Sequence, residues 1–234
     1  MEIKTIIEEP VNKIWEKYKD LVDVPPLSVS EVPKNGIIFI GINPSLGEDD
    51  KVKLQQVDNK KIEFYPSPAN EIEKPHPYFK KFIKVHENVG LPWGHIDLLY
   101  IRETQQSKIN DMIKDEKSIH FIYEQTRVTR TVIDEIIKKA NPKVFVVNNT
   151  LARGLLGRYK TNDDIFPNNI PEGQKHWIDY LFEWNDEYGT FFLKGTDIPF
   201  FFSSMFTGQR ALDNGSFERL IWHIKYVLKK LEIK

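Results

Sequence analysis

The sequence predicts a single three-layer α/β/α domain with a mostly parallel central sheet, and two observations lead to this prediction. Short apolar runs without polar alternation, such as Ile37–Ile40 and Val144–Val147, are typical of strands buried on both faces. Longer stretches with apolar residues at helical spacing, of which Ile119–Ala140 is the clearest, alternate with these runs along the chain. Strands that alternate with helices favour a parallel sheet covered by helices on both faces.

The composition agrees with one globular domain and excludes several kinds of site. The chain has 234 residues, of which 40% are hydrophobic and 29% are charged. It contains no cysteine, which excludes disulfides, thiolate metal sites and cysteine nucleophiles. Because the formal net charge is −1, any binding of DNA depends on a local basic patch. Because the sequence lacks an apolar signal core and any run of about 18 apolar residues, we expect a cytoplasmic protein.

The first part of the chain is expected to hold a helix, a buried strand and a long loop. Apolar residues in Ile3–Val22 recur at helical spacing, with Pro10 as a break or kink, so residues 1–24 are expected to form an N-terminal helical extension. The buried strand Gly36–Ile40 follows after a proline-rich connection. Residues 41–77 are polar and rich in proline, which predicts a long loop with a functional role.

The rest of the chain continues the alternation of helices and strands up to a closing amphipathic helix. Ser216 or Asn214 is expected to cap that last helix. There is no internal repeat and no linker, so the prediction is one domain over residues 1–234. The expected elements after the loop lie at Tyr78–Asn88, Ile96–Ile101, Ile119–Ala140, Val144–Val147, Leu151–Leu156, Phe191–Leu193, Phe200–Phe202 and Ser216–Leu231.

Small and polar residues follow four of the expected strands, at the edge where open α/β sheets bind their ligands. These segments are Gly41–Ser45, Arg102–Gln106, Asn148–Thr150 and Ser203–Arg210. None of them carries the glycine-rich pattern of a dinucleotide fold or of a P-loop. The histidines show no spacing typical of a metal site, so no metal is expected. Arg153 and Arg158, near the exit of the third strand, are candidates for contact with a nucleic-acid backbone.

The segment Gly41–Ser45 combines residue types that suit a binding loop. Gly41 permits a close approach of the backbone, and Pro44 restricts Asn43 to an extended conformation. An asparagine held in this way presents an amide that can hold a water molecule or read a planar ligand edge. An ordinary turn at the end of a strand is the alternative interpretation, because Asn and Pro are common in turns.

The run Ile37–Ser45 resembles the first motif of the uracil-DNA glycosylase superfamily, especially its mismatch-specific branch, which reads strand–Gly-Ile-Asn-Pro. Further segments resemble later parts of the same family in the same order, so the resemblance covers residues 36–231. These segments are Pro77–Phe82 with Gly90–Leu91, Asp97–Thr104, Val144–Leu156 and Ser203–Arg210. The resemblance implies a DNA glycosylase that flips out a uracil or a related damaged base and hydrolyses its N-glycosidic bond. It implies no cofactor, and a monomer acting on single- or double-stranded DNA.

The resemblance also implies roles for individual residues. Asn43 is the implied catalytic residue, which positions the attacking water. Met205 or Phe206 is the implied wedge into the base stack, and Arg210 is placed on a phosphate. The implied base pocket consists of Gly41, Ile42, Pro44, Ser45, Tyr65, Tyr78 and Asn148. The implied DNA-contacting residues are Ser203, Ser204, Met205, Phe206, Thr207, Gly208, Gln209 and Arg210. For the two tyrosines, packing under the long loop is the alternative to stacking on a base.

Two departures from the family pattern leave other functions open. Ser203–Met205 stands where the family has His-Pro-Ser or Asn-Pro-Ser, so the histidine that would stabilise the leaving base is missing. By the family pattern, Asp97 stands at the end of the second strand, where an asparagine is usual. The alternatives are a catalytically weak or inactive relative that binds DNA or a nucleobase, and a hydrolase of small nucleosides. A steep salt dependence of DNA binding would separate the DNA-binding hypotheses from the nucleoside hydrolase.

Overall fold

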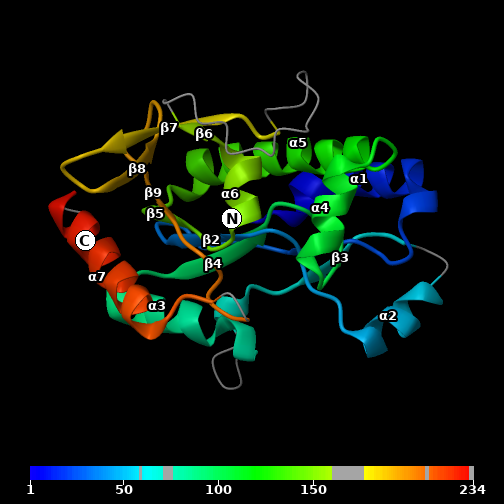
Figure 1. The fold of residues 1–234 in the computed structure, drawn as a ribbon, viewed down its shortest axis with the longest axis horizontal. Helices are drawn as coiled ribbons and strands as arrows, with labels where there is room; N and C mark the ends of the chain where they lie inside the picture. Colours follow the sequence, from blue (N-terminus) through cyan, green and yellow to red (C-terminus); the bar gives the residue numbers. More distant parts are fainter. Residues whose placement is uncertain (58–59, 71–75, 160–176, 209–210, 232–234) are drawn as a thin grey trace.

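The computed structural model describes residues 1–57, 60–70, 76–159, 177–208 and 211–231. Within these ranges the chain forms a mixed α/β fold around a central sheet that is mostly parallel (Figure 1). The strands of this sheet are β2 (Ile37–Gly41), β4 (Trp93–Asp97), β5 (Val144–Val147), β6 (Gly157–Tyr159), β7 (Tyr180–Asn185), β8 (Thr190–Leu193) and β9 (Pro199–Phe202). They lie in the order β4-β2-β5-β9-β8-β7-β6.

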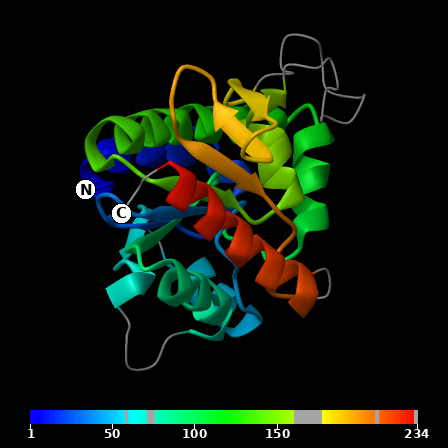
Figure 2. The ribbon, with the colours of Figure 1, turned by 90° about the vertical axis from the view of Figure 1, so that its left-hand side faces the viewer.

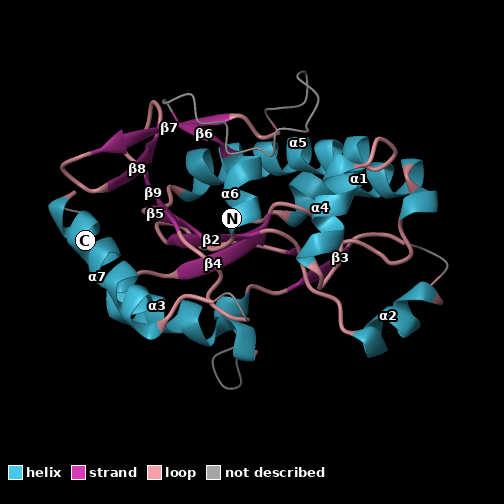
Figure 3. Cartoon of the chain, viewed as in Figure 1, coloured by secondary structure: helices cyan, strands magenta, loops and turns pink. Residues whose placement is uncertain are grey.

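The parallel part of the sheet consists of the neighbouring strands β4, β2, β5 and β9. Beyond it, β8 runs antiparallel to β9 and to β7, and β6 pairs in parallel with β7 (Figure 3). The α-helices are α1 (Lys4–Lys17), α2 (Glu48–Gln55), α3 (Lys80–Val89), α4 (Gln106–Lys114), α5 (Ile119–Glu135), α6 (Thr150–Leu156) and α7 (Asn214–Lys230). Short 3-10 or π turns lie at Lys19–Leu21, Pro68–Asn70, Pro77–Phe79 and Ile136–Ala140.

Helices cover both faces of the sheet, because successive side chains of a strand point to opposite faces. Ile37 and Phe39 of β2 pack in one core cluster with residues of α3 and α7, and this side is called the α3 face below. Ile38 and Ile40 pack in a second cluster with residues of α1, α4, α5 and α6, and this side is called the α5 face. Figures 1 and 2 show the two helical layers on either side of the strands. The helix–sheet–helix layering expected from the sequence is therefore present.

The N-terminal helix belongs to the core and is not an extension of it. Helix α1 buries Ile7, Val11, Ile14 and Trp15. The Trp15 ring lies edge-on to Phe121 of α5, with ring centroids 5.0 Å apart, and its Nε1 donates to Val24 O at 3.0 Å. Pro10 lies inside α1 and does not end it. The buried stripe fixes the helix against α5, and this packing outweighs the one hydrogen bond that a proline removes.

Three expectations about the elements need correction. Residues 41–77 are not one loop, because they contain α2 and the strand β3 (Glu63–Tyr65), which pairs in parallel with β1 (Leu27–Val29). The second strand runs over Trp93–Asp97, earlier than expected, because only these residues pair with β2. Helix α4 and strands β6 and β7 were also not expected. Helix α2 is polar and β3 and β6 have three residues each, so hydrophobic periodicity gives little signal for them, whereas α4, which buries Ile109 and Ile113, and β7 have a pattern that the prediction missed.

The cap of the last helix is Asp213, and neither Ser216 nor Asn214 fills this position. The Asp213 carboxylate accepts from Ser216 N at 2.9 Å and from Ser216 Oγ at 2.6 Å. Asn214 is the first residue of the helix itself. None of the helices in the described part of the chain combines the length and the apolar character needed to cross a membrane.

We expect the substitution Asp213→Ala to lower the free energy of unfolding by about 1 kcal/mol, the usual effect of losing an N-cap. Asn214→Ala is the matched control and should change it little, because the structure gives Asn214 no capping bond. Urea unfolding of both variants measures the two effects. Equal losses for the two variants would contradict the assignment of the cap.

Candidate functional site

The connections between the strands change direction at the carboxyl ends of β2 and β5. From β2 the chain passes to β4 on one side, and then returns across β2 to β5 on the other side. Helix α3, which precedes β4, lies on the α3 face, whereas α6, which follows β5, lies on the α5 face. Open α/β sheets bind their ligands at the point where the strand order reverses in this way. The segments that begin with Gly41 and Asn148 leave the sheet at this point.

A cluster of polar side chains lies at these strand ends on the α3 face. His95 and Asp97 follow Trp93 at every second position of β4, so all three lie on this face. The His95 ring is packed by Tyr78, Phe79 and Phe82, with ring centroids 5.6 to 6.0 Å apart. His95 Nε2 lies 3.8 Å from Asp97 Oδ1, which is too long for a hydrogen bond.

The missing side chain of Gly41 makes room for this cluster. Gly41 pairs with Asp97 in the ladder between β2 and β4. A Cβ atom at position 41 would lie 2.3 Å from Asp97 Oδ1 and 2.9 Å from His95 Nε2. The φ angle of Gly41 is not in the left-handed region. The glycine is therefore required by the close approach of Asp97 and His95 and not by an unusual backbone conformation.

Several buried polar atoms of this cluster have no hydrogen-bond partner among the described residues. They are both ring nitrogens of His95 and Oδ1 of Asn148, the residue after β5. The side chain of Asp97 is 11% exposed, so the cluster is close to the surface. Buried polar atoms are nearly always paired in folded proteins. A planar molecule that offers both donors and acceptors would satisfy these atoms, which makes the cluster a candidate binding site.

Burial sets the charges in the cluster. It raises the pKa of Asp97 to about 7 and lowers the pKa of His95 to about 3. Burial also raises the pKa of Tyr65 and of Tyr78, and the negative charge of Asp97 adds to both shifts. His95 is therefore neutral at pH 7 and does not form an ion pair with Asp97. The carboxyl group of Asp97 changes between its neutral and charged forms near neutral pH.

The amide of Asn43 has a defined orientation. Its two N–H hydrogens are shared among three carbonyl oxygens, Pro44 O at 2.9 Å, Ile101 O at 3.2 Å and Glu103 O at 2.6 Å from Nδ2. Carbonyl oxygens can only accept, so the amide cannot be flipped without losing these bonds. Among the described residues, no hydrogen bond to Asn43 Oδ1 is present, and this oxygen can accept one from a ligand or a water. The amide thus joins the Gly41–Ser45 loop to the segment after β4.

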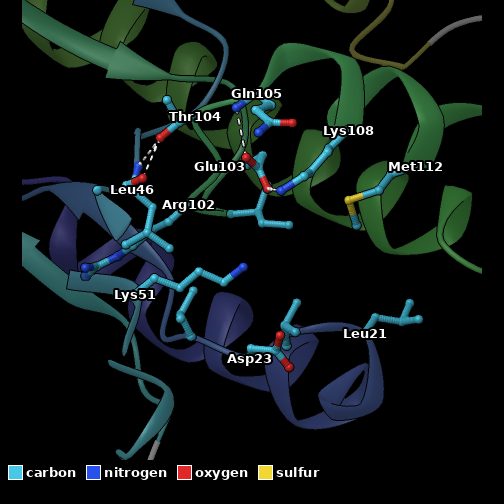
Figure 4. Close-up of a pocket in the computed structure, with 14 residues that line it drawn as sticks. Leu21, Asp23, Leu46, Lys51, Arg102, Glu103, Thr104, Gln105, Lys108 and Met112 are labelled. Carbon is cyan, nitrogen blue, oxygen red and sulfur yellow. Dashed lines mark hydrogen bonds and ion pairs between the residues drawn. The ribbon is translucent and has the colours of Figure 1, made fainter. Parts of the chain in front are cut away.

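A pocket of about 410 Å³ lies beside this loop, between the segment after β4 and the end of α1 (Figure 4). Figure 4 shows Lys108 paired with Glu103, whereas no interaction is drawn for Lys51 or Asp23. Lys108 Nζ lies 3.2 Å from Glu103 Oε2, and Thr104 Oγ1 donates to Leu46 O at 2.5 Å. Arg102 forms an ion pair with Glu63. Arg102 Nε, in the lining of this pocket, is also buried without a hydrogen-bond partner among the described residues, but the polar cluster holds three such atoms, on His95 and Asn148, and is therefore the stronger candidate site.

The structure brings together four of the residues implied for the base pocket and separates three others from them. Gly41, Tyr65, Tyr78 and Asn148 all belong to the cluster around Asp97: the charge of Asp97 acts on both tyrosines, and Asn148 interacts with Tyr78. The other three residues lie elsewhere. Ile42 packs in the α5-face core, and Ser45 is exposed. Pro44 is buried, and its carbonyl oxygen accepts from Asn43 Nδ2 and from Glu103 N.

The segment after β9 corrects one implied role. Phe206 is 1% exposed and packs against Phe39, Phe82 and Phe217 in the α3-face core. The expectation that Phe206 acts as a wedge is therefore wrong, because the ring would have to leave the core. Met205 is half-buried. Ser203 and Thr207 are also half-buried, and Ser204 and Gly208 are exposed. Gln209 and Arg210 lie outside the described residues.

Sequence reasoning treated His95 as a structural residue and Asp97 only as a departure from a pattern. The signal that would have found both is their spacing of two residues in a strand, which places them on one face. In the described part of the chain, no three His, Asp or Glu side chains gather as a metal site requires. Comparison with protein-family models, with curated proteins and with solved structures gives no match for this chain.

We expect the substitution Asp97→Asn to stabilise the protein relative to the parent as the pH rises. The pKa of Asp97 is about 7 in the folded state and 3.8 ordinarily. The folded state therefore holds its proton longer than the unfolded chain, and stability is lost as the pH rises through about 7. The Tm of the variant minus the Tm of the parent should therefore increase between about pH 5 and about pH 8.

Thermal unfolding at a series of pH values measures this difference. The contribution of His95, whose lowered pKa weakens the fold as the pH falls toward 3, is common to parent and variant and cancels. Asp111→Asn, at an exposed position of α4, is the control and should give no comparable trend. A Tm difference for Asp97→Asn that does not depend on pH would contradict the raised pKa.

Proposed function

We propose that the chain is a DNA glycosylase-like protein that binds a flipped-out uracil or related damaged base and hydrolyses its N-glycosidic bond. One observation carries this proposal. The Gly-Ile-Asn-Pro-Ser loop and a buried cluster with unpaired polar atoms meet at the same carboxyl ends of the sheet. A flipped base is read by hydrogen bonds to its edge and by contacts with aromatic rings, and the cluster offers both kinds of group.

The base-reading groups of this proposal are Asp97 and Asn148, with Tyr65 and Tyr78 beside them. The neutral carboxyl of Asp97 donates one hydrogen bond and accepts another, as an amide does. It therefore pairs with the adjacent N–H and carbonyl of a uracil-type edge. The pKa of about 7 keeps much of this group neutral at physiological pH. The unpaired Oδ1 of Asn148 supplies a second acceptor.

Hydrolysis needs a water under the sugar and donors for the departing base. The water is held by Asn43 Oδ1, because the three bonds of Nδ2 fix the amide. The water oxygen bonds to C1′ as the C1′–N bond breaks, the bonding electrons leave with the base, and the proton that the water loses passes to the departing base anion. Neutral His95 and neutral Asp97 are the donors that stabilise the charge developing on the base. No group of this cluster needs a cofactor for these steps.

The alternative of a weak enzyme or a base-binding protein is favoured by one observation. Asn43 is an amide whose nitrogen is engaged with three carbonyls, so it can orient a water but cannot remove its proton. A protein with this site would bind a base well and cleave slowly. The hydrolase of small nucleosides differs from both in needing no DNA.

We expect Asn43→Ala to lower the rate of uracil release by about 100-fold or more, the effect of losing the position of a reacting group. The assay measures base release from single-stranded DNA and from uracil opposite guanine or adenine, with free deoxyuridine as a further substrate. Thr104→Val is the matched control, since it loosens the same loop by removing the Thr104–Leu46 bonds without touching Asn43.

The control variant should keep most of its rate if the water is held by Asn43. Equal losses in the two variants would show that only the order of the loop matters. Absence of release by the folded parent protein from all DNA substrates would contradict the proposed hydrolysis. Release from deoxyuridine alone would favour the nucleoside hydrolase.

A further inference from the structure

A second pocket, of about 420 Å³, lies beyond the ends of β5 and β9, between α6 and α7. Its lining is cationic and polar, and no Asp or Glu is among the described residues that line it. The residues that carry the argument are Thr150, Arg153, Ser203, Ser204 and Arg219. They come from three elements far apart in sequence, so the fold assembles the pocket.

The two arginines of this pocket have guanidinium groups without an ion pair among the described residues. Arg153 is half-buried, and its Nε is buried with no hydrogen-bond partner. Arg219 Nε donates weakly to Gly215 O at 3.4 Å, which leaves its terminal nitrogens free to bind a ligand. The carboxylate of Asp213 accepts from the amide of Ser216 at 2.9 Å and from its hydroxyl at 2.6 Å, and its charge also attracts that of Arg219, with which it forms no ion pair within 4 Å among the described residues.

Two guanidinium groups that share one pocket repel each other, and an anion between them removes this repulsion. Guanidinium groups bind phosphate oxygens in a bidentate manner, which distinguishes them from the point charge of lysine. The hydroxyls of Thr150 and Ser204, both at exposed positions, add donors of the kind that contact phosphates. The chemistry of the lining is therefore that of a phosphate site.

The pocket is next to the polar cluster. Ser203 N donates to Val147 O at 2.8 Å, so the segment that lines the pocket is held beside the end of β5, where Asn148 begins. Neighbouring strands are about 4.8 Å apart. The Ser203 end of this pocket thus lies about one strand spacing from the end of β5, on the side away from β4 and Asp97.

We propose that this pocket binds a backbone phosphate of a nucleic-acid strand, through Arg153 and Arg219. This proposal rests on the proposed function, because the phosphate in this pocket and the base at the polar cluster are taken to belong to one nucleic-acid strand. The phosphate fixes the strand beside the site, and base reading is left to the cluster around Asp97.

The test measures binding of a fluorescent single-stranded oligonucleotide of undamaged bases to the full chain at several salt concentrations. Arg153→Gln and Arg219→Gln should each weaken binding about tenfold, the effect of one lost charge-assisted hydrogen bond. Each should also reduce the slope of log K against log salt by about 0.7. Arg153→Lys should recover part of the affinity. Arg127→Gln, an exposed arginine of α5 outside the pocket, is the control and should change neither quantity.

Arg219 is exposed, so its variant keeps the proposal testable if Arg153→Gln fails to fold. Unchanged affinity and salt slope in Arg219→Gln would overturn the proposal. Inorganic phosphate is the second probe. If both substitutions weaken the binding of phosphate but leave the affinity for the oligonucleotide unchanged, the pocket binds free phosphate and not a nucleic-acid strand, and the proposal is overturned. Because the oligonucleotide contains no damaged base, the result is independent of base release, and failure of the glycosylase assay alone would leave this measurement intact.

Discussion

Asp97 and His95 occupy space that any side chain at position 41 would fill, and this close approach between β4 and β2 determines the geometry of the candidate site. A Cβ atom on residue 41 would be 2.3 Å from the Asp97 carboxylate oxygen. The sheet pairs Gly41 directly with Asp97, so the polar cluster and the Gly41–Ser45 loop cannot be moved independently. Asn43 then ties that loop to the segment after β4 through three carbonyl groups.

Burial determines what chemistry the cluster can support. The aromatic rings of Tyr78, Phe79 and Phe82 surround His95 and keep it neutral, with a pKa of about 3. Because His95 carries no charge, it does not hold Asp97 in its ionised form, and burial raises the pKa of that carboxyl to about 7. A neutral acid beside a neutral imidazole gives hydrogen-bond donors without fixed charge. This suits recognition of a neutral base and stabilisation of charge that develops on it.

The sequence predicted the parts of the fold that have strong hydrophobic patterns. The strands at Ile37–Ile40 and Val144–Val147 and the long helix α5 were found because each has a clear periodicity or an unbroken apolar run. Helix α2 was missed because it is polar on all sides, and strand β3 was missed because it has only three residues. In the site, the residue types of Gly41–Ser45 suggested a binding loop with an ordinary turn as the alternative, and the role of Asn43 stays a prediction from the resemblance.

The role of Asp97 and His95 could not be derived in the same way. Their spacing indicates a common face only once β4 is known to run over Trp93–Asp97, and the sequence placed that strand later. The burial of Phe206 depends on contacts with Phe39, Phe82 and Phe217, which come from three separate elements, so no local pattern shows it. Long-range packing decides both cases.

Carbon-13 NMR of the aspartate carboxyl groups would show whether the Asp97 cluster binds a nucleobase. The Asp97 signal would be followed through a pH titration with and without a DNA strand that carries 2′-fluoro-deoxyuridine, whose sugar resists formation of the oxocarbenium ion. We expect this strand to shift the Asp97 signal and its titration midpoint, and the same strand with an abasic site to leave both unchanged. If the strand with 2′-fluoro-deoxyuridine binds the protein but leaves the Asp97 titration unchanged, the cluster is not the base-binding site.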